Sequence, residues 1–341
     1  MTGSEKVVAF GELMLRLGAP DRERLLQSAR LVATFGGAEA NVAASLARFG
    51  HDVRMATVLP DNALGRAAID QLRMTGVDTS AIRLVPGRIG LYFLTPGAVQ
   101  TPTDVLYDRA GSAFATADPD GWDWKTLLDG AGWLHLSGVT PAIGPGPCAA
   151  TLSAAAAAVE AGVKVVFDGN FRGKLWALWN GDPSATCRAI LGHATVAFIN
   201  DLDVTLALGE RFEIDDLVSR RRAAAHRAFE VFPRLQTIAC TLRQMDGVDS
   251  CTLGGLIFAR TGEEAAVAPR RLSSMVDRIG GGDAFAAGVL HGVISGMGAK
   301  GSLEFGLAAS ILKHAVPGDF NPSSVADVEA MMLAGGSDVR R

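Results

Sequence analysis

The sequence predicts an α/β protein built on a doubly wound, mostly parallel sheet, with a small β-sheet lid beside it. The main observation is that short, continuously apolar runs alternate with longer amphipathic or alanine-rich stretches, which is typical of a parallel sheet covered by helices on both faces. A second observation is that two stretches interrupt this alternation. The chain has 341 residues, of which 48% are hydrophobic, so it can bury the core of one large α/β domain.

The expected core strands are short β-rich runs. They are VVAFGE near the start and the runs at 53–59, 163–170, 195–200 and 237–242. The segments NVAASLARFG and TLSAAAAAVEAG are expected to be helical, because their apolar residues recur at helical spacing and each segment ends at a glycine suited to a helix C-terminus.

The two interrupting stretches are residues 12–35 and 84–115, where LYFLTPG and DVLYDRAG suggest antiparallel strands. They are either surface loops or a small lid over a site at the carboxyl ends of the core strands. We found no internal repeat or low-complexity linker, so we expect one domain over residues 1–335 with the lid inserted in pieces, and a C-terminal tail at 336–341.

Bulk composition argues against several classes of partner. A net charge of −4 and a pI near 5.9 give no general attraction to nucleic acid or anionic lipid, so any phosphate site has to be local. The cysteines lie far apart and form no C-x-x-C pair, which indicates buried thiols in a reducing compartment. No signal peptide or bilayer-length apolar run is apparent, so we expect a cytoplasmic protein that binds small molecules.

The strongest local motif is a glycine-rich turn. Neither a P-loop nor a G-x-G-x-x-G motif after a strand occurs, but Val276 to Asp283 reads VDRIGGGD and precedes the apolar run AFAAGVLHGVI. Gly280, Gly281 and Gly282 leave the backbone amides unobstructed, and the following helix directs its unpaired N–H groups and positive dipole end to the same place. The turn therefore predicts an anion hole, that is, a set of backbone amides that binds phosphate.

Asp283 ends this turn and has two interpretations. It is either an N-cap for the following helix or a general base that removes a proton from a sugar hydroxyl during phosphoryl transfer. Local spacing favours the N-cap; the rest of the chain favours the base.

The sequence resembles the PfkB (ribokinase-like) carbohydrate kinases almost from end to end. Their D-T-x-G-A-G-D-x-F signature is matched by Asp277, Gly280, Gly282, Asp283 and Phe285. Arg278 and Gly281 replace the usual Thr and Ala. The resemblance implies a ribokinase-like fold, ATP as phosphoryl donor, and catalytic roles for Asp283 and for the glycines of the turn, which also contact the nucleotide.

The amino-terminal family signature is matched by FGGAEANVAASLARFG. Gly36, Gly37 and Asn41 occupy the positions that contact sugar hydroxyls in relatives. By itself GGAEAN is also a flexible turn before a helix, but the two signatures occur in the family's order, each at a strand-to-helix turn.

Shorter matches resemble the 2-keto-3-deoxygluconate kinases of this family, among them GELMLRL, LYFL, YDRAGSA, DGNFRGKLW and LKHAVPGDFN. In such kinases a Tyr and an Arg of the lid and a second Arg after a core strand hold the acid sugar. The matching residues are Tyr107, Arg109 and Arg172, and Tyr92 fits a further substrate contact. Alternatively, Tyr92 packs within the lid and either Arg forms a surface ion pair.

The resemblance also implies a Mg²⁺ site held through water. Relatives carry N-x-x-E, whereas this chain offers Asn200 and Asp203, a shorter carboxylate, with Asp201 as a substitute. The nucleotide pocket is less well matched. Thr241 and Arg243 are expected near the ATP phosphates, the equal alternative being a strand-end Thr and a solvated Arg. Lys313 and His314 are expected near adenine.

Asp319 is expected to border either the substrate or the nucleotide. For Lys313, His314 and Asp319 the alternative is an exposed helix end and turn. The implied reaction transfers the γ-phosphoryl group of ATP to the terminal hydroxyl of 2-keto-3-deoxygluconate. The rivals are a kinase for fructose or another sugar, and a sugar- and nucleotide-binding regulator. We also expect a homodimer formed through the lid.

Overall fold

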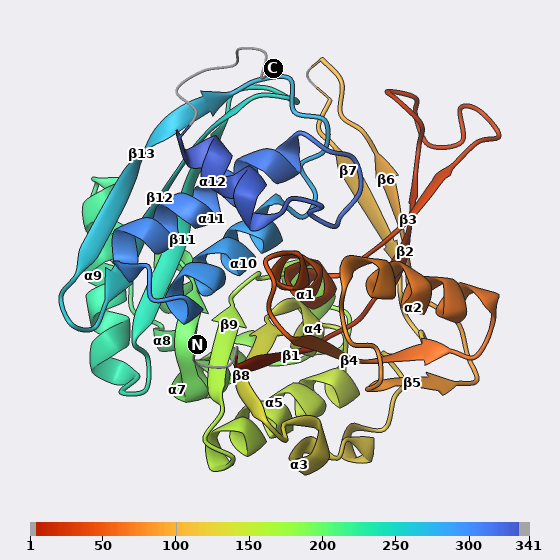
Figure 1. Ribbon diagram of the computed structural model, residues 1–341, viewed down its shortest axis with the longest axis horizontal. Helices are drawn as coiled ribbons and strands as arrows, with labels where there is room; N and C mark the ends of the chain where they lie inside the picture. The colour runs from red at the N-terminus through yellow and green to blue at the C-terminus, as the bar shows by residue number, and fades with distance from the viewer. Residues whose placement is uncertain (1–4, 100, 334–341) are drawn as a thin grey trace.

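The computed structural model describes residues 5–99 and 101–333, and it confirms the predicted α/β class (Figure 1). Its main sheet has nine strands in the order β13-β12-β11-β10-β9-β8-β1-β4-β5. Neighbours from β11 to β5 are parallel, whereas β12 and β13 form an antiparallel edge that the sequence pattern did not predict. The strands are β1 (Lys6–Phe10), β4 (Val53–Pro60), β5 (Ile82–Val85), β8 (Ala131–Ser137), β9 (Lys164–Asp168), β10 (Ala194–Phe198), β11 (Thr237–Met245), β12 (Cys251–Ala259) and β13 (Glu264–Leu272).

Helices cover both faces of this sheet. Successive strand residues point to opposite sides, so each core strand contributes side chains to two separate apolar clusters. In β1, Val7 and Ala9 belong to one buried cluster, and Val8 and Phe10 to another. The first cluster includes α1 (Ala38–Arg48), α2 (Ala63–Thr75), α10 (Gly281–Ile294), α11 (Gly298–His314) and α12 (Val325–Leu333). The second includes α3 (Trp124–Leu127), α5 (Pro145–Glu160), α7 (Pro183–His193), α8 (Asp201–Leu208) and α9 (Leu217–Val231). The remaining helical turns are η1 (Pro119–Gly121), α4 (Val139–Ala142) and α6 (Gly173–Trp176).

The two segments that interrupt the α/β alternation form a second sheet. Its order is β3 (Val32–Gly36), β2 (Met14–Gly18), β6 (Leu91–Thr95) and β7 (Asp104–Asp108). The expected antiparallel pairing of β6 with β7 is present, but β2 and β6 pair in parallel because they come from separate segments. The surface-loop alternative is therefore wrong.

The sequence located the helix ends well. Both α1 and α5 are followed at the second residue by a glycine with positive φ, 87° at Gly50 and 72° at Gly162, as expected for a C-terminal glycine. The tail expected at 336–341 lies outside the described residues. Within the described ranges, no helix combines the length and apolar character needed to cross a bilayer.

Candidate active site

Two adjoining cavities lie where the carboxyl ends of the main-sheet strands meet the second sheet. The first, called the lid cavity here, has a volume of about 350 Å³ and lies between the second sheet and the start of α10. The second, called the strand cavity, has a volume of about 650 Å³ and lies beside the ends of β10 and β11 and the start of α8. Asp168, Asn170, Arg172 and Gly282 line both cavities, so the two spaces meet at the first turn of α10.

The glycine-rich turn has the open backbone that the sequence predicts. Gly280 is the N-cap of α10 with φ of 80°, and a Cβ atom there would lie 2.2 Å from the carbonyl oxygen of Asp319. A Cβ at Gly281 would lie 2.4 Å from the His314 ring, whereas one at Gly282 would meet nothing within 4 Å. Among the described residues, the N–H groups of Gly282 and Asp283 have no acceptor, as expected at a helix N-terminus. The turn thus presents free amides where the two cavities meet.

Asp283 is not the N-cap of α10, so that alternative is wrong. It is the third helical residue, and its side chain makes no capping bond. Instead Asn41 Nδ2 of α1 donates to Asp283 Oδ2 at 2.6 Å, which joins the two family signatures in space. Burial raises the pKa of Asp283 to about 7, against the opposing effects of the Asn41 hydrogen bond and the Arg172 charge. A carboxyl with a pKa near neutrality suits a general base.

Asp168 is a site residue that the sequence reasoning missed. It ends β9 and lines both cavities. Burial raises its pKa well above the usual range, and the nearby carboxyls of Asp283 and Asp203 act in the same direction. Its position at the carboxyl end of a core strand, in VKVVFDGN, was a usable signal.

Arg109 lines the lid cavity, but it is neither solvated nor free. Its Nε atom donates to Glu12 Oε2 at 2.8 Å, and Ser112 Oγ donates to Glu12 Oε1 at 2.5 Å. Arg109 and Glu12 are 5% and 2% exposed, so the alternative of a surface ion pair is wrong and the pair is a buried one. Sequence reasoning did not identify Glu12, although it stands in GELMLRL.

Arg172 has the opposite environment. Its side chain is exposed, Nη1 donates to the carbonyl of Phe171 at 3.1 Å, and no carboxylate of the described chain forms an ion pair with it. Arg243 and Arg278 also line the lid cavity, and burial together with the Arg278 charge lowers the pKa of Arg243. The lid cavity therefore has unpaired positive charge near the amides of α10.

Tyr92 and Asp319 form part of a buried polar network under the second sheet. The Tyr92 hydroxyl donates to Asp319 Oδ2, and Arg16 Nη1 lies 2.9 Å from Asp319 Oδ1 and 2.7 Å from Asp277 Oδ2. Asp319 lines the lid cavity rather than the strand cavity, so the structure puts it beside the expected sugar contacts. Gly36 does not line the cavity; a Cβ there would lie 2.1 Å from Asp319 Oδ2, so this glycine makes room for the carboxylate.

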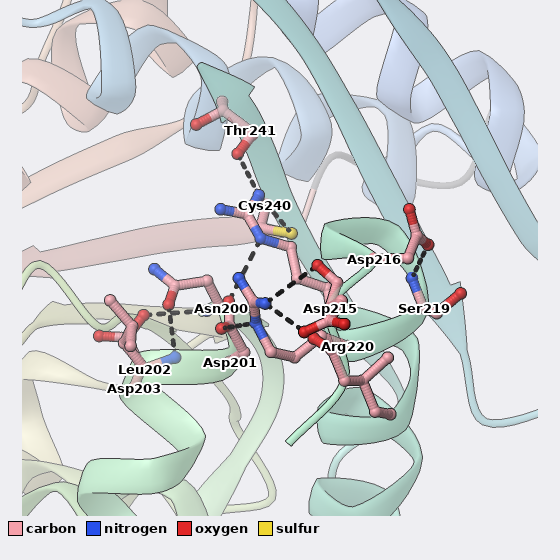
Figure 2. Close-up of polar contacts among 12 residues, drawn as sticks. Asn200, Asp201, Leu202, Asp203, Asp215, Asp216, Ser219, Arg220, Cys240 and Thr241 are labelled. Atoms are coloured by element: carbon pink, nitrogen blue, oxygen red, sulfur yellow. Dashed lines mark hydrogen bonds and ion pairs between the residues drawn. The ribbon is translucent and has the colours of Figure 1, made fainter. Parts of the chain in front are cut away.

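The strand cavity contains the residues expected to hold metal and phosphate. Asn200 is the N-cap of α8, its side chain accepts a hydrogen bond from Leu202 N at 2.7 Å, and Asp203 Oδ2 accepts one from Asn200 N at 2.9 Å (Figure 2). Burial raises the pKa of Asp203 to about 6. Thr241, in the middle of β11 and two residues beyond the last residue that pairs with β10, lines the same cavity. Asp201 is not free for a metal, because two arginines pair with it.

The remaining expected contacts divide between the two sides. Gly37 and Tyr107 line the lid cavity. Lys313 is fully buried, lines neither cavity, and donates to the carbonyl of Val316 at 3.2 Å. The structure thus places neither Lys313 nor Asp319 with Asn200 and Thr241. Within the described residues, no group of three or more His, Cys, Asp or Glu side chains is arranged to hold a metal directly.

Comparison with known proteins gives consistent results. The pfkB family carbohydrate kinase model matches residues 4–324. The 2-dehydro-3-deoxygalactonokinase of Haloferax volcanii is 31% identical over 98% of this chain and 99% of its own, and the 2-dehydro-3-deoxygluconokinase of Bacillus subtilis is 26% identical over 92% and 91%. The crystal structure of 2-dehydro-3-deoxygluconokinase from Thermotoga maritima superimposes with a TM-score of 0.90 and 37% identity, covering 97% of this chain and 100% of that one.

Proposed function

We propose that this chain, which belongs to the pfkB family of carbohydrate kinases and is an ATP-dependent sugar kinase, phosphorylates the terminal hydroxyl of 2-keto-3-deoxygluconate. One observation carries the assignment of roles. The lid cavity and the strand cavity meet at Gly282, next to a carboxyl whose pKa is about 7. A sugar hydroxyl in the first cavity and a nucleotide in the second would meet beside that carboxyl.

In this proposal Asp283 is the general base. Its carboxylate accepts the proton of the terminal hydroxyl as the oxygen attacks the γ-phosphorus, and the bond to the β,γ-bridging oxygen breaks so that ADP leaves. Asn41 orients the carboxylate through its 2.6 Å hydrogen bond. The free N–H groups of Gly282 and Asp283 stabilise charge on the transferring group. The second sheet excludes water, which would otherwise hydrolyse ATP.

The strand cavity is proposed to hold the ATP phosphates, with Thr241 as a contact and Arg243 reaching from the lid cavity. Mg²⁺ fits this region because burial raises the pKa values of the Asp168 and Asp203 carboxyls, and the charge of Asp203 adds to the rise at Asp168, a situation that a divalent cation would relieve. Asn200 and Asp203 would hold it through water, since each already uses an oxygen in the cap of α8. The metal supplies charge neutralisation on the phosphates.

The proposed substrate class rests on the arginines. A keto-deoxy sugar acid carries a carboxylate, and a guanidinium binds carboxylates through charge-assisted, often bidentate hydrogen bonds. Arg172 has no carboxylate partner in the described chain, so its charge is available to a ligand. Arg109 is already paired with Glu12. It is therefore proposed to help position the sugar by a hydrogen bond, without supplying an uncompensated positive charge. Gly37, Tyr92 and Tyr107 would surround the rest of the sugar.

The galactonate-derived epimer is a second candidate, because the Haloferax volcanii relative that matches nearly the whole chain is named a 2-dehydro-3-deoxygalactonokinase.

The substrate assignment is tested by a coupled ADP-release assay over both epimers, fructose and other neutral sugars. We expect the highest kcat/KM on a keto-deoxy acid. Arg172→Ala should lower that value roughly ten- to a hundredfold, the worth of a hydrogen bond to a charged group, with a much smaller effect on any neutral sugar. Preference of the wild type for fructose would refute the acid-sugar assignment, and activity on no sugar would favour a regulator.

We also propose a homodimer formed through the second sheet. Its outer strands β3 and β7 are edges with exposed apolar side chains, Val32 at 51% and Leu106 at 59% exposure. Unpaired edges of this kind are suited to pairing with another copy. Light scattering should give twice the chain mass, and Leu106→Lys should give the monomer.

All the cysteines of the chain are free and buried, which supports a reducing compartment such as the cytoplasm.

A further inference from the structure

We infer that Arg221 is a positioning residue for the nucleotide side of the site. Its guanidinium joins Thr241, in the part of β11 beyond its pairing with β10, to the first turn of α8, whose N-cap is Asn200. The inference rests on the proposed assignment of the strand cavity to ATP. Arg221 itself does not line the cavity, so it acts through the residues that do.

The need for such a link follows from the strand pairing. β10 and β11 pair in parallel only as far as Phe198 and Ala239, where β10 ends and the chain turns into α8. β11 continues to Met245, with β12 on one edge but without β10 on the other. A backbone carbonyl beyond this point needs a donor from elsewhere. Arg221 Nη1 supplies it, donating to the carbonyl of Thr241 at 2.5 Å.

The same guanidinium reaches α8. Arg221 Nε lies 3.4 Å from Asp201 Oδ1. Asp201 is the first residue of α8, where a carboxylate interacts favourably with the helix dipole (Figure 2). The side chains of Arg221 and Asp201 are only 14% and 7% exposed, so solvent screens this contact little. A planar guanidinium can direct separate N–H groups at both acceptors, which a lysine ammonium does less well. One largely buried side chain therefore sets the separation of two cavity walls.

Arg220 offers a matched control. Its Nε atom lies 2.8 Å from Asp201 Oδ2, so it shares the same carboxylate, but its Nη1 atom donates to the carbonyl of Ile214 at 2.8 Å (Figure 2). Neither Arg220 nor Ile214 lines the strand cavity, and no hydrogen bond of Arg220 reaches β11. Substitution of Arg220 therefore removes one ion pair of Asp201 but keeps the hydrogen bond from Arg221 to the Thr241 carbonyl.

The experiment compares Arg221→Met with Arg220→Met in the full-length enzyme, with KM measured separately for ATP and for the sugar acid and with ATP binding measured in the absence of sugar. We expect Arg221→Met to raise KM and Kd for ATP about tenfold, close to the worth of one hydrogen bond to a charged group, and to leave the sugar KM within about twofold. Arg220→Met should leave both KM values within about twofold while lowering the thermal midpoint. If Arg221→Met does not fold, Asp201→Asn replaces it, with a smaller rise in the ATP KM alone.

Two results would overturn the inference. Equal ATP KM values for wild type and folded Arg221→Met, or an equal effect of the two arginine variants, would reduce Arg221 to a structural role. A rise in the sugar KM without a change for ATP would instead refute the assignment of the strand cavity to the nucleotide. Asn200→Ala separates these failures, because it tests that cavity assignment without touching the Arg221 link.

Discussion

The carboxyl of Asp283 should control the pH dependence of phosphoryl transfer. Burial raises its pKa to about 7, so in the free enzyme the group is largely protonated, and unable to accept a proton, at lower pH. We expect kcat/KM for the sugar to fall about tenfold for each pH unit below about 7 and to level off above it, because kcat/KM for the sugar reports the ionisation of the enzyme form to which the sugar binds. The assay is run at saturating Mg²⁺ and ATP, so that the ionisation of free nucleotide does not enter.

Two variants identify the group responsible. Asp283→Asn should lose roughly 10²- to 10⁴-fold in kcat and should no longer show this acid limb. Arg172→Met should move the limb to higher pH, since the Arg172 charge lowers the pKa of Asp283. An acid limb that is unchanged in Asp283→Asn, or near-normal turnover by that variant, would show that Asp283 is not the base.

The same raised pKa has a consequence for stability. A carboxyl that is harder to ionise in the folded state than in the unfolded state costs stability as pH rises from its unfolded pKa, about 3.9, to its folded value. The loss of unfolding free energy reaches its full value above about pH 7. Asp283→Asn removes it, so the variant should unfold at a higher temperature than the wild type at pH 8, with a smaller difference at pH 5. A constant difference between the two pH values would contradict the raised pKa.

Three further predictions test other parts of the site. Gly280→Ala should destabilise the fold by at least about 1–2 kcal/mol, because its φ of 80° is left-handed and a Cβ would meet backbone, whereas Gly282→Ala should unfold at nearly the wild-type urea concentration. Asp203→Asn should raise the Mg²⁺ concentration that gives the half-maximal rate, with little effect on the sugar KM. An unchanged Mg²⁺ dependence would mean that Asp203 does not hold the metal. Arg109→Ala should cost about 3–5 kcal/mol of unfolding free energy in urea, because it leaves Glu12 buried and unpaired, and adding Glu12→Gln should restore part of that loss.

The sequence predicted the fold class, several core strands and the second sheet, because these depend on local periodicity and on glycines that end helices. It did not predict β12 and β13. Their antiparallel pairing follows a parallel core, and an isolated apolar run does not reveal the direction of its neighbour. Nor did it predict that β2 and β6 pair in parallel, since they are separated in sequence by α1, β4 and α2.

The candidate site shows a similar division. Residues within a motif, such as Asp283 and Asn41, could be identified from the sequence, but their mutual hydrogen bond requires α1 and α10 to pack together. Glu12 was overlooked because a lone acidic residue after a strand has no local signature, and only the fold shows that it is buried against Arg109. For Lys313 the alternatives were a contact near adenine and an exposed helix end; the structure buries the side chain, which the position of a lysine at a helix end does not indicate.

The site also explains how a chain with a net charge of −4 can bind two anions. Around the lid cavity, the positive charge of Arg109 is balanced by Glu12, and Arg16 is shared between the carboxylates of Asp319 and Asp277. Arg172, Arg243 and Arg278 line the same cavity without an ion pair to any described carboxylate, and they lie near the amides of α10. These arginines therefore supply local positive charge where phosphate and a sugar carboxylate would arrive. Burial and, after it, the charge of Arg278 lower the pKa of Arg243, so a ligand of negative charge would relieve an unfavourable environment for this guanidinium.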